Sequence, residues 1–165
     1  MVAEARSRAT ERHDWVLLAY RLPREPSTPR IAVWRRLKRL GVAQLLDGLV
    51  ALPLDARNRE RLEWVADAIA ESGGQVTIWL GRLSSRGEER AIMTELSSAI
   101  ATEYRAVIVD AAGAGAAEPA SRRRTLKRLR RELHRIRQRD YFPPPEAEGA
   151  RRAVERLAAL EEVPA

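Results

Sequence analysis

The sequence has 165 residues, and its composition excludes several classes of protein at the outset. It contains no cysteine, which rules out disulfide frameworks, thiolate metal sites and thiol nucleophiles. Hydrophobic residues make up 45% of the chain, enough for a packed core. There are 30 Lys and Arg residues against 23 Asp and Glu residues, a formal net charge of +7 at pH 7 that favours polyanionic partners such as nucleic acid.

The chain shows no membrane or export signal. No apolar run approaches the ~20 residues that a membrane-spanning helix needs. Residues 1–13 carry several charged side chains and no apolar stretch, unlike a signal peptide. We therefore expect a short disordered tail over residues 1–13 and a cytoplasmic protein without a membrane partner.

The first predicted elements are a strand and a helix. Residues 14–22 (DWVLLAYRL) are rich in strand formers and predict a nearly buried strand. Residues 30–40 repeat apolar side chains at helical spacing. Ser27 or Thr28 is the expected N-cap of that helix, and Gly41 is expected to end it in the left-handed conformation.

A hairpin, a second helix and a last strand follow. Two apolar runs at residues 43–46 and 49–54 are separated by an Asp-Gly pair, which is a strong hairpin signal because such turns need positive φ angles. Residues 58–72 have the apolar spacing of a helix, and residues 75–81 alternate as a strand does. The order strand, helix, strand, strand, helix, strand is the βαββαβ pattern.

This pattern predicts an α+β fold with a ferredoxin-like βαββαβ core over residues 14–83. The remaining part, residues 84–165, is expected to be a mainly helical extension. Within it we predict a helix over residues 84–102, a short edge strand over residues 103–110 and a flexible linker over residues 111–120. A final helix is expected over residues 148–160.

The excess of basic residues is confined to one segment of that extension. Residues 121–140 hold ten Lys and Arg residues and two acidic residues, a net charge of +8, so the rest of the chain sums to −1. The segment predicts a helix over residues 122–139, with apolar residues spaced by three, four and three positions along one narrow stripe. That stripe consists of Leu126, Leu129, Leu133 and Ile136.

We expect this basic helix to contact nucleic-acid phosphates through charge, without reading sequence. The alternative is a solvated amphipathic helix, but internal ion pairs poorly explain a segment with so few acidic residues. The residues expected to contact phosphates are Arg122, Arg123, Arg124, Lys127, Arg128, Arg130 and Arg131.

Other charged and aromatic residues receive structural interpretations. The four arginines of the first helix, at positions 30, 35, 36 and 39, are expected to pair with Glu60, Glu63 and Asp67 on the neighbouring helix rather than to extend a basic surface. Packing in a core or interface is favoured over base stacking for the four tryptophans. They are Trp15, Trp34, Trp64 and Trp79.

No catalytic or metal site is indicated. His13 and His134 are the only histidines, and neither has a carboxylate cluster nearby in the sequence. We therefore expect a protein that is not an enzyme and that has no cofactor.

Three stretches together resemble a known family. They are DWVLLAYRLPREPSTPRIAVWRRLKRLG at residues 14–41, DGLVALP at residues 47–53, and the basic helix with the RDYFP that follows it. In order and spacing they are similar to the N-terminal region of ChrB, the regulators encoded beside chromate-efflux genes, over residues 14–142. The resemblance implies a DNA-binding transcriptional regulator of chromate resistance. ChrB proteins usually continue into a second domain associated with sensing, so the implied chromate response depends on that domain.

A more distant resemblance is to the ferredoxin-like domains of Cas2 and of the PaaX C-terminal region. Cas2-like nucleases hold metal with an aspartate at the end of the first strand. Residues 19–23 of this chain (AYRLP) place no carboxylate there. A Cas2-like nuclease is therefore the weakest of the hypotheses.

Two other hypotheses remain open. The first is a DNA-binding regulator of the ChrB type that forms a homodimer, since the uncovered sheet face and the Leu126–Ile136 stripe both require a partner. The second is a protein-interaction module that acts with a separately encoded sensor domain, in which the apolar stripe matters more than the arginines.

Overall fold

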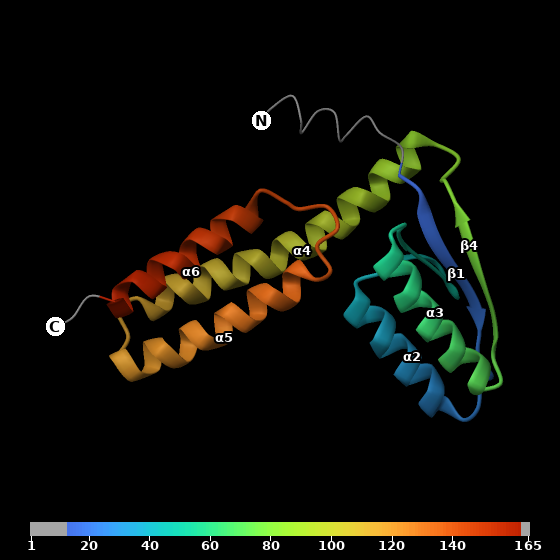
Figure 1. Ribbon diagram of the computed structural model, residues 1–165, viewed down its shortest axis with the longest axis horizontal. Helices are drawn as coiled ribbons and strands as arrows, with labels where there is room; N and C mark the ends of the chain where they lie inside the picture. Colours follow the sequence, from blue (N-terminus) through green and yellow to red (C-terminus); the bar gives the residue numbers. More distant parts are fainter. Residues whose placement is uncertain (1–12, 163–165) are drawn as a thin grey trace. The chain divides into compact units, whose positions relative to one another are not determined.

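A computed structural model describes residues 13–162 of the chain (Figure 1). The chain divides into two compact units, which we call unit 1 (residues 1–93) and unit 2 (residues 94–165). Of the tail predicted at residues 1–13, all but the last residue lies outside the described residues.

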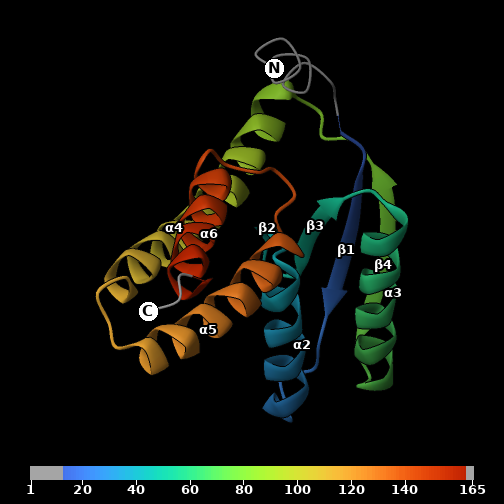
Figure 2. The ribbon, with the colours of Figure 1, turned by 60° about the vertical axis from the view of Figure 1, so that its left-hand side comes forward.

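Unit 1 is built on a four-stranded antiparallel sheet in the order β2-β3-β1-β4 (Figure 2). The strands are β1 (Trp15–Arg21), β2 (Ala43–Leu46), β3 (Leu49–Pro53) and β4 (Gln75–Gly81). The helices between them are α2 (Ser27–Leu40) and α3 (Ala56–Glu71). The α+β class and the chain order of these six elements are as the sequence predicts.

The core of unit 1 follows from alternation along its central strands. In β1, Val16 and Leu18 are fully buried and lie opposite Leu52 and Val50 of β3. Because side chains alternate across a strand, these residues share one face of the sheet. The helices supply the other half of this core, with the buried residues Val33, Leu37, Leu62, Val65 and Ile69.

Local turns and caps fix the ends of these elements. Gly48 has a φ of 80° in the β2–β3 turn, and its carbonyl accepts a hydrogen bond of 2.7 Å from the Tyr20 amide, which seats the hairpin against β1. Gly41 ends α2 with a φ of 68°, as predicted. The prediction that Ser27 or Thr28 caps α2 is wrong: both lie inside the helix, the N-cap position is Pro26, and no side chain caps this end.

Unit 2 is a bundle of three helices. They are α4 (Arg86–Ala114), which begins in unit 1, α5 (Pro119–Arg137) and α6 (Glu146–Glu162). The strand predicted at residues 103–110 is wrong, because α4 continues to Ala114. The linker predicted at residues 111–120 is shorter than expected, since only residues 115–118 separate α4 from α5. Tyr104, Val107 and Ala111 are buried at intervals of three and four, the helical period. The β-branched residues favour a strand locally, but burial of this face in the bundle overrides that weak propensity.

The apolar stripe of α5 is satisfied inside unit 2. Its four residues form one buried cluster with α4 and α6, which includes Tyr104, Val107, Val154 and Leu157. The expectation that this stripe requires a second protein is therefore wrong. Interaction through Leu129 and Leu133, as the interaction-module hypothesis expected, is excluded by the same packing.

A partly buried polar pair connects α4 with the segment that follows α5. The Tyr104 hydroxyl donates a 2.8 Å hydrogen bond to Oδ2 of Asp140. The other carboxyl oxygen of Asp140 is buried without a hydrogen-bond partner. Burial raises the pKa of Asp140, although the bond from Tyr104 opposes that shift. Burial also raises the pKa of Tyr104, so its hydroxyl remains a donor at neutral pH.

We predict that Leu129→Ala lowers the free energy of unfolding by about 2–5 kcal/mol, because truncating a fully buried leucine removes its packing contacts and leaves a cavity. Leu160→Ala is the matched control, because Leu160 is 48% exposed on α6 and its removal should cost about 1 kcal/mol or less. Urea titration followed by circular dichroism of helix measures both. Equal losses in the two variants would contradict the packing described.

The raised pKa of Asp140 gives a pH dependence of known sign. Its stabilising contribution is fully present below its ordinary pKa of 3.8 and is lost as the pH rises through the higher value of the folded state. Asp140→Asn keeps an acceptor for Tyr104 but has no charge. We therefore expect this variant to lose less stability than the unsubstituted protein between about pH 4 and about pH 7 in urea titrations. A parallel decline in both proteins would show that Asp140 does not titrate with folding.

Candidate nucleic-acid interface

The charge of unit 2 is concentrated on α5. This helix holds nine Lys and Arg residues and one glutamate, a net formal charge of +8. Its apolar stripe is buried against α4 and α6, so the basic side chains occupy the remaining faces of the helix. The seven residues predicted to contact phosphates all lie on this helix, but the structure places them in two groups.

Arg122 belongs to the framework of unit 2. It is largely buried, and its Nε donates to a carboxylate oxygen of Glu161 on α6. Its Nη1 also donates to the backbone carbonyls of Gly115 and Ala117, at 3.3 Å and 3.4 Å. These contacts join the start of α5 to α6 and to the turn after α4. The guanidinium group of Arg122 is thus already occupied.

Two further residues of the predicted set form exposed ion pairs with carboxylates. Arg128 donates to Asp110 of α4 over 2.8 Å, in a pair that is about half exposed. Arg123 lies 3.7 Å from the second oxygen of Glu161 but is mostly exposed. Exposed pairs of this kind contribute little to stability and exchange readily for another anion.

The other four predicted residues, Arg124, Lys127, Arg130 and Arg131, are exposed, and none has a carboxylate partner among the described residues. Arg124, Lys127 and Arg131 are spaced by three and four, so they line one outward stripe of α5. Sequence reasoning missed Arg137, which is also exposed on α5 without an acidic partner in the described chain. We call the set of Arg124, Lys127, Arg130, Arg131 and Arg137 the free basic surface.

The free basic surface suits polyanion binding. Along a helix that rises about 1.5 Å per residue, Arg124 and Arg131 are separated by about 10 Å. Duplex DNA carries one negative charge per ~1.7 Å of its axis, so several cations can meet phosphates at once. Contacts of this kind supply affinity and position but no base specificity.

The ion pairs predicted between α2 and α3 do not form. Glu63 pairs instead with Arg59, one turn away on its own helix, at 2.8 Å. Among the described residues, Arg30 and Arg35 have no carboxylate partner. An i,i+4 pair requires less ordering of long side chains than a pair across two helices, which accounts for the difference.

The tryptophans are mostly at the surface. Trp15 is buried, and its Nε1 donates a 3.3 Å hydrogen bond to Glu89. Trp34, Trp64 and Trp79 are 52%, 56% and 62% exposed. Core packing is confirmed for Trp15. The other three indole rings are accessible, so for them packing at an interface stays a prediction.

Two kinds of feature are absent from residues 13–162. No group of three or more His, Cys, Asp or Glu side chains is arranged to hold a metal ion there. No helix in the same range combines the length and apolar character needed to cross a membrane.

Comparison with known proteins identifies the family. The family described as "Protein ChrB, N-terminal" matches residues 30–163, from α2 through α6. This chain belongs to the ChrB N-terminal family. The resemblance inferred from the sequence is thereby confirmed.

Two relatives extend this result. Protein ChrB of Cupriavidus metallidurans strain CH34 is 29% identical over 133 residues, which cover 78% of this chain and 40% of that protein. The chain thus spans less than half the length of this curated relative. The uncharacterized protein Rv0674 of Mycobacterium tuberculosis is similar in structure, with a TM-score of 0.57 and 15% identity over 98% of this chain and 71% of that one. The second comparison supports the fold alone.

The two groups of arginines should differ in stability. We predict that Arg122→Gln lowers the free energy of unfolding by about 1–3 kcal/mol, because Glu161 and two carbonyls lose a largely buried partner. Arg124→Gln, which removes the same charge from an exposed position, should stay within about 0.5 kcal/mol. Urea titration of both variants measures the difference. A loss of the same size in both would mean that Arg122 is as dispensable for folding as Arg124.

Proposed function

We propose that this chain is a DNA-binding transcriptional regulator of chromate resistance, which contacts DNA phosphates with α5. The observation that supports this most directly is the free basic surface, where exposed cations without acidic partners lie along a single helix. Membership of the ChrB family supports the link to chromate resistance.

The proposal assigns the chain a binding role rather than a catalytic one. A helix that offers only arginine and lysine to a polyanion binds through charge, and it needs no reacting group. A regulator that contacts chromosomal DNA would act in the cytoplasm, and this location is part of the proposal.

A homodimer is also part of the proposal, although one of the two observations that favoured it no longer does so. The apolar stripe of α5 no longer argues for it, since unit 2 buries that stripe internally. What remains is the sheet face that carries Trp79 and Leu17, which are paired in register on β4 and β1. The exposed fraction of Trp79 is 62%. Light scattering after size-exclusion chromatography measures the mass directly.

The second candidate function is a protein-interaction module that acts with a separate sensor domain. The same exposed apolar side chains of unit 1 favour it, including Trp64, Trp79 and Leu46. This candidate differs from the first because it assigns no role to the arginines of α5. Binding of DNA therefore distinguishes the two.

We predict that the chain binds random-sequence duplex DNA with an affinity that falls steeply as salt rises. The triple substitution Arg124→Gln/Lys127→Gln/Arg131→Gln should weaken binding and reduce the slope of log K against log salt concentration by up to about three. Fluorescence anisotropy of labelled duplex across a salt series measures both quantities.

The matched control is Arg151→Gln/Arg152→Gln/Arg156→Gln on α6, which removes the same net charge from another helix. Binding close to that of the unsubstituted chain is expected for this control. Two results would reject the proposal: no binding at low salt, or equal weakening by both triple variants, which would indicate an effect of net charge alone.

A further inference from the structure

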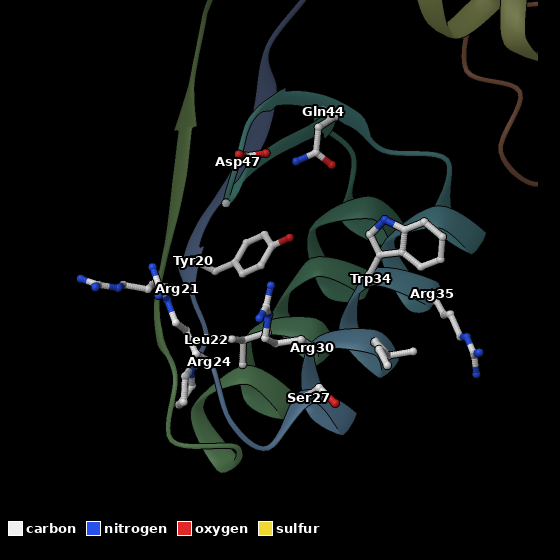
Figure 3. A pocket seen from close by; sticks show the side chains of 13 residues that line it. Tyr20, Arg21, Leu22, Arg24, Ser27, Arg30, Trp34, Arg35, Gln44 and Asp47 are labelled. Carbon is white, nitrogen blue, oxygen red and sulfur yellow. The ribbon is translucent and has the colours of Figure 1, made fainter.

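Unit 1 contains an open hollow of about 1200 Å³ that sequence reasoning did not anticipate (Figure 3). Three segments line it: the end of β1 with the residues that follow, the N-terminal half of α2, and the β2–β3 hairpin. All of its lining residues belong to unit 1. The hollow therefore shares no residue with the basic surface of α5.

The lower part of the hollow is positively charged. Arg24, Arg30 and Arg35 line it, and none of them has a carboxylate partner among the described residues. Figure 3 shows the guanidinium group of Arg30 directed into the hollow beneath the ring of Tyr20, whereas Arg35 extends away from its centre. Arg30 is thus the cation best placed for a ligand inside.

The start of α2 adds to this positive character. Ser27, the first residue of the helix, lines the hollow, and no side chain caps this end. Pro26 and Pro29 have no N–H, so the amides at this helix start are those of Ser27 and Thr28, and they attract anions because the helix dipole is positive there. Arginines and a helix start at one wall form a combination that fits a phosphate group.

Two aromatic rings form opposite walls above this charge. Tyr20 projects from β1 and Trp34 from α2, and Figure 3 shows them on the two sides of the hollow. Trp34 is 52% exposed, and Lys38 Nζ lies 4.7 Å from the centre of its ring. Burial and the charge of Asp47 raise the pKa of Tyr20, so its ring stays neutral at physiological pH. Aromatic walls of this kind accept a flat ring by stacking.

The rim at the hairpin is polar. Gln44 and Asp47 line the hollow there, above the two rings (Figure 3). Gln44 Nε2 donates to the Leu46 carbonyl over 2.8 Å, which holds the amide in place and leaves its oxygen as an acceptor. An amide and a carboxylate suit the hydrogen-bonding edge of a nucleobase.

We propose that this hollow binds a nucleotide, with its phosphate at Arg30 and the start of α2, and its base between Tyr20 and Trp34. The edge of the base faces Gln44 and Asp47. A bare oxyanion would use the arginines but leave the aromatic walls and most of the volume unoccupied. An apolar ligand would offer no hydrogen-bond acceptor to the unpaired guanidinium groups.

The same chemistry is offered by two sources, a free nucleoside monophosphate and a nucleotide within a single strand. Neither involves the phosphate contacts of α5. Whether the hollow binds a nucleotide can therefore be tested independently of duplex binding.

The test uses the full chain and isothermal titration with the four ribonucleoside 5′-monophosphates, with inorganic phosphate as the comparison ligand. At least one nucleotide should bind about tenfold more tightly than phosphate, because stacking adds to the charge interaction. Arg30→Gln and Trp34→Ala should each weaken nucleotide binding by about tenfold or more. Both side chains are exposed, so the variants should fold, and circular dichroism checks this.

The matched controls are Arg39→Gln on the same helix and Trp64→Ala on α3. Both side chains are exposed and lie outside the hollow, and both variants should bind as the unsubstituted chain does. The proposal is overturned if no nucleotide binds at millimolar concentration. It is equally overturned if phosphate binds as tightly as every nucleotide while Trp34→Ala changes nothing, since that describes a plain anion site.

A second arm separates the two sources. A short single-stranded oligonucleotide is titrated into the Arg124→Gln/Lys127→Gln/Arg131→Gln background, where contacts of α5 are reduced. Binding about tenfold tighter than that of the mononucleotides, and still sensitive to Trp34→Ala, assigns the site to a strand; tighter binding of a mononucleotide assigns it to a free ligand. If the unsubstituted chain binds a nucleotide but no duplex DNA at low salt, the proposed function is rejected while this site is supported.

Discussion

The burial of one narrow apolar stripe on α5 determines how unit 2 presents its charge. Leu126, Leu129, Leu133 and Ile136 form the buried apolar stripe of that helix and are covered by α4 and α6. Because this stripe faces the other helices, helical geometry places the basic side chains of α5 on its flanks and outer face. The same packing explains why Arg122 differs from its neighbours, since it lies next to the stripe and meets Glu161. Hydrophobic packing thus decides which arginines are available to a ligand.

Elements with strong local signals were predictable. The alternation in β1 and β4, the Asp47-Gly48 turn and the glycine that ends α2 all act within a few residues, and each of these elements forms as expected. The helix at residues 103–110 was not predictable. The β-branched side chains there indicate a strand, whereas the burial pattern of the same residues is helical. Such a conflict is resolved by partners far along the chain, here α5 and α6, which a local window cannot contain.

The candidate interface was predictable as a helix but not as a set of contacts. Charge counting locates α5, yet it cannot separate Arg122 or Arg128 from Arg124, because the deciding carboxylates are Glu161 and Asp110 on other helices. The hollow of unit 1 was not predictable from any local pattern in the sequence. Arg30 and Arg35 were assigned to ion pairs and Trp34 to a core or an interface, and only the fold brings the end of β1, α2 and the hairpin around one space.

The two surfaces are suited to different tasks in recognition. A row of cations on a helix binds any polyanion, and its affinity depends on salt rather than on base identity. A concave site with stacking walls and a polar rim discriminates, since a group of the wrong shape leaves buried or partly buried polar atoms without partners. Under the two proposals above, affinity for nucleic acid and selectivity for a ligand reside in separate units of the chain. Substitutions that abolish one property should therefore leave the other measurable, because no side chain contributes to both surfaces.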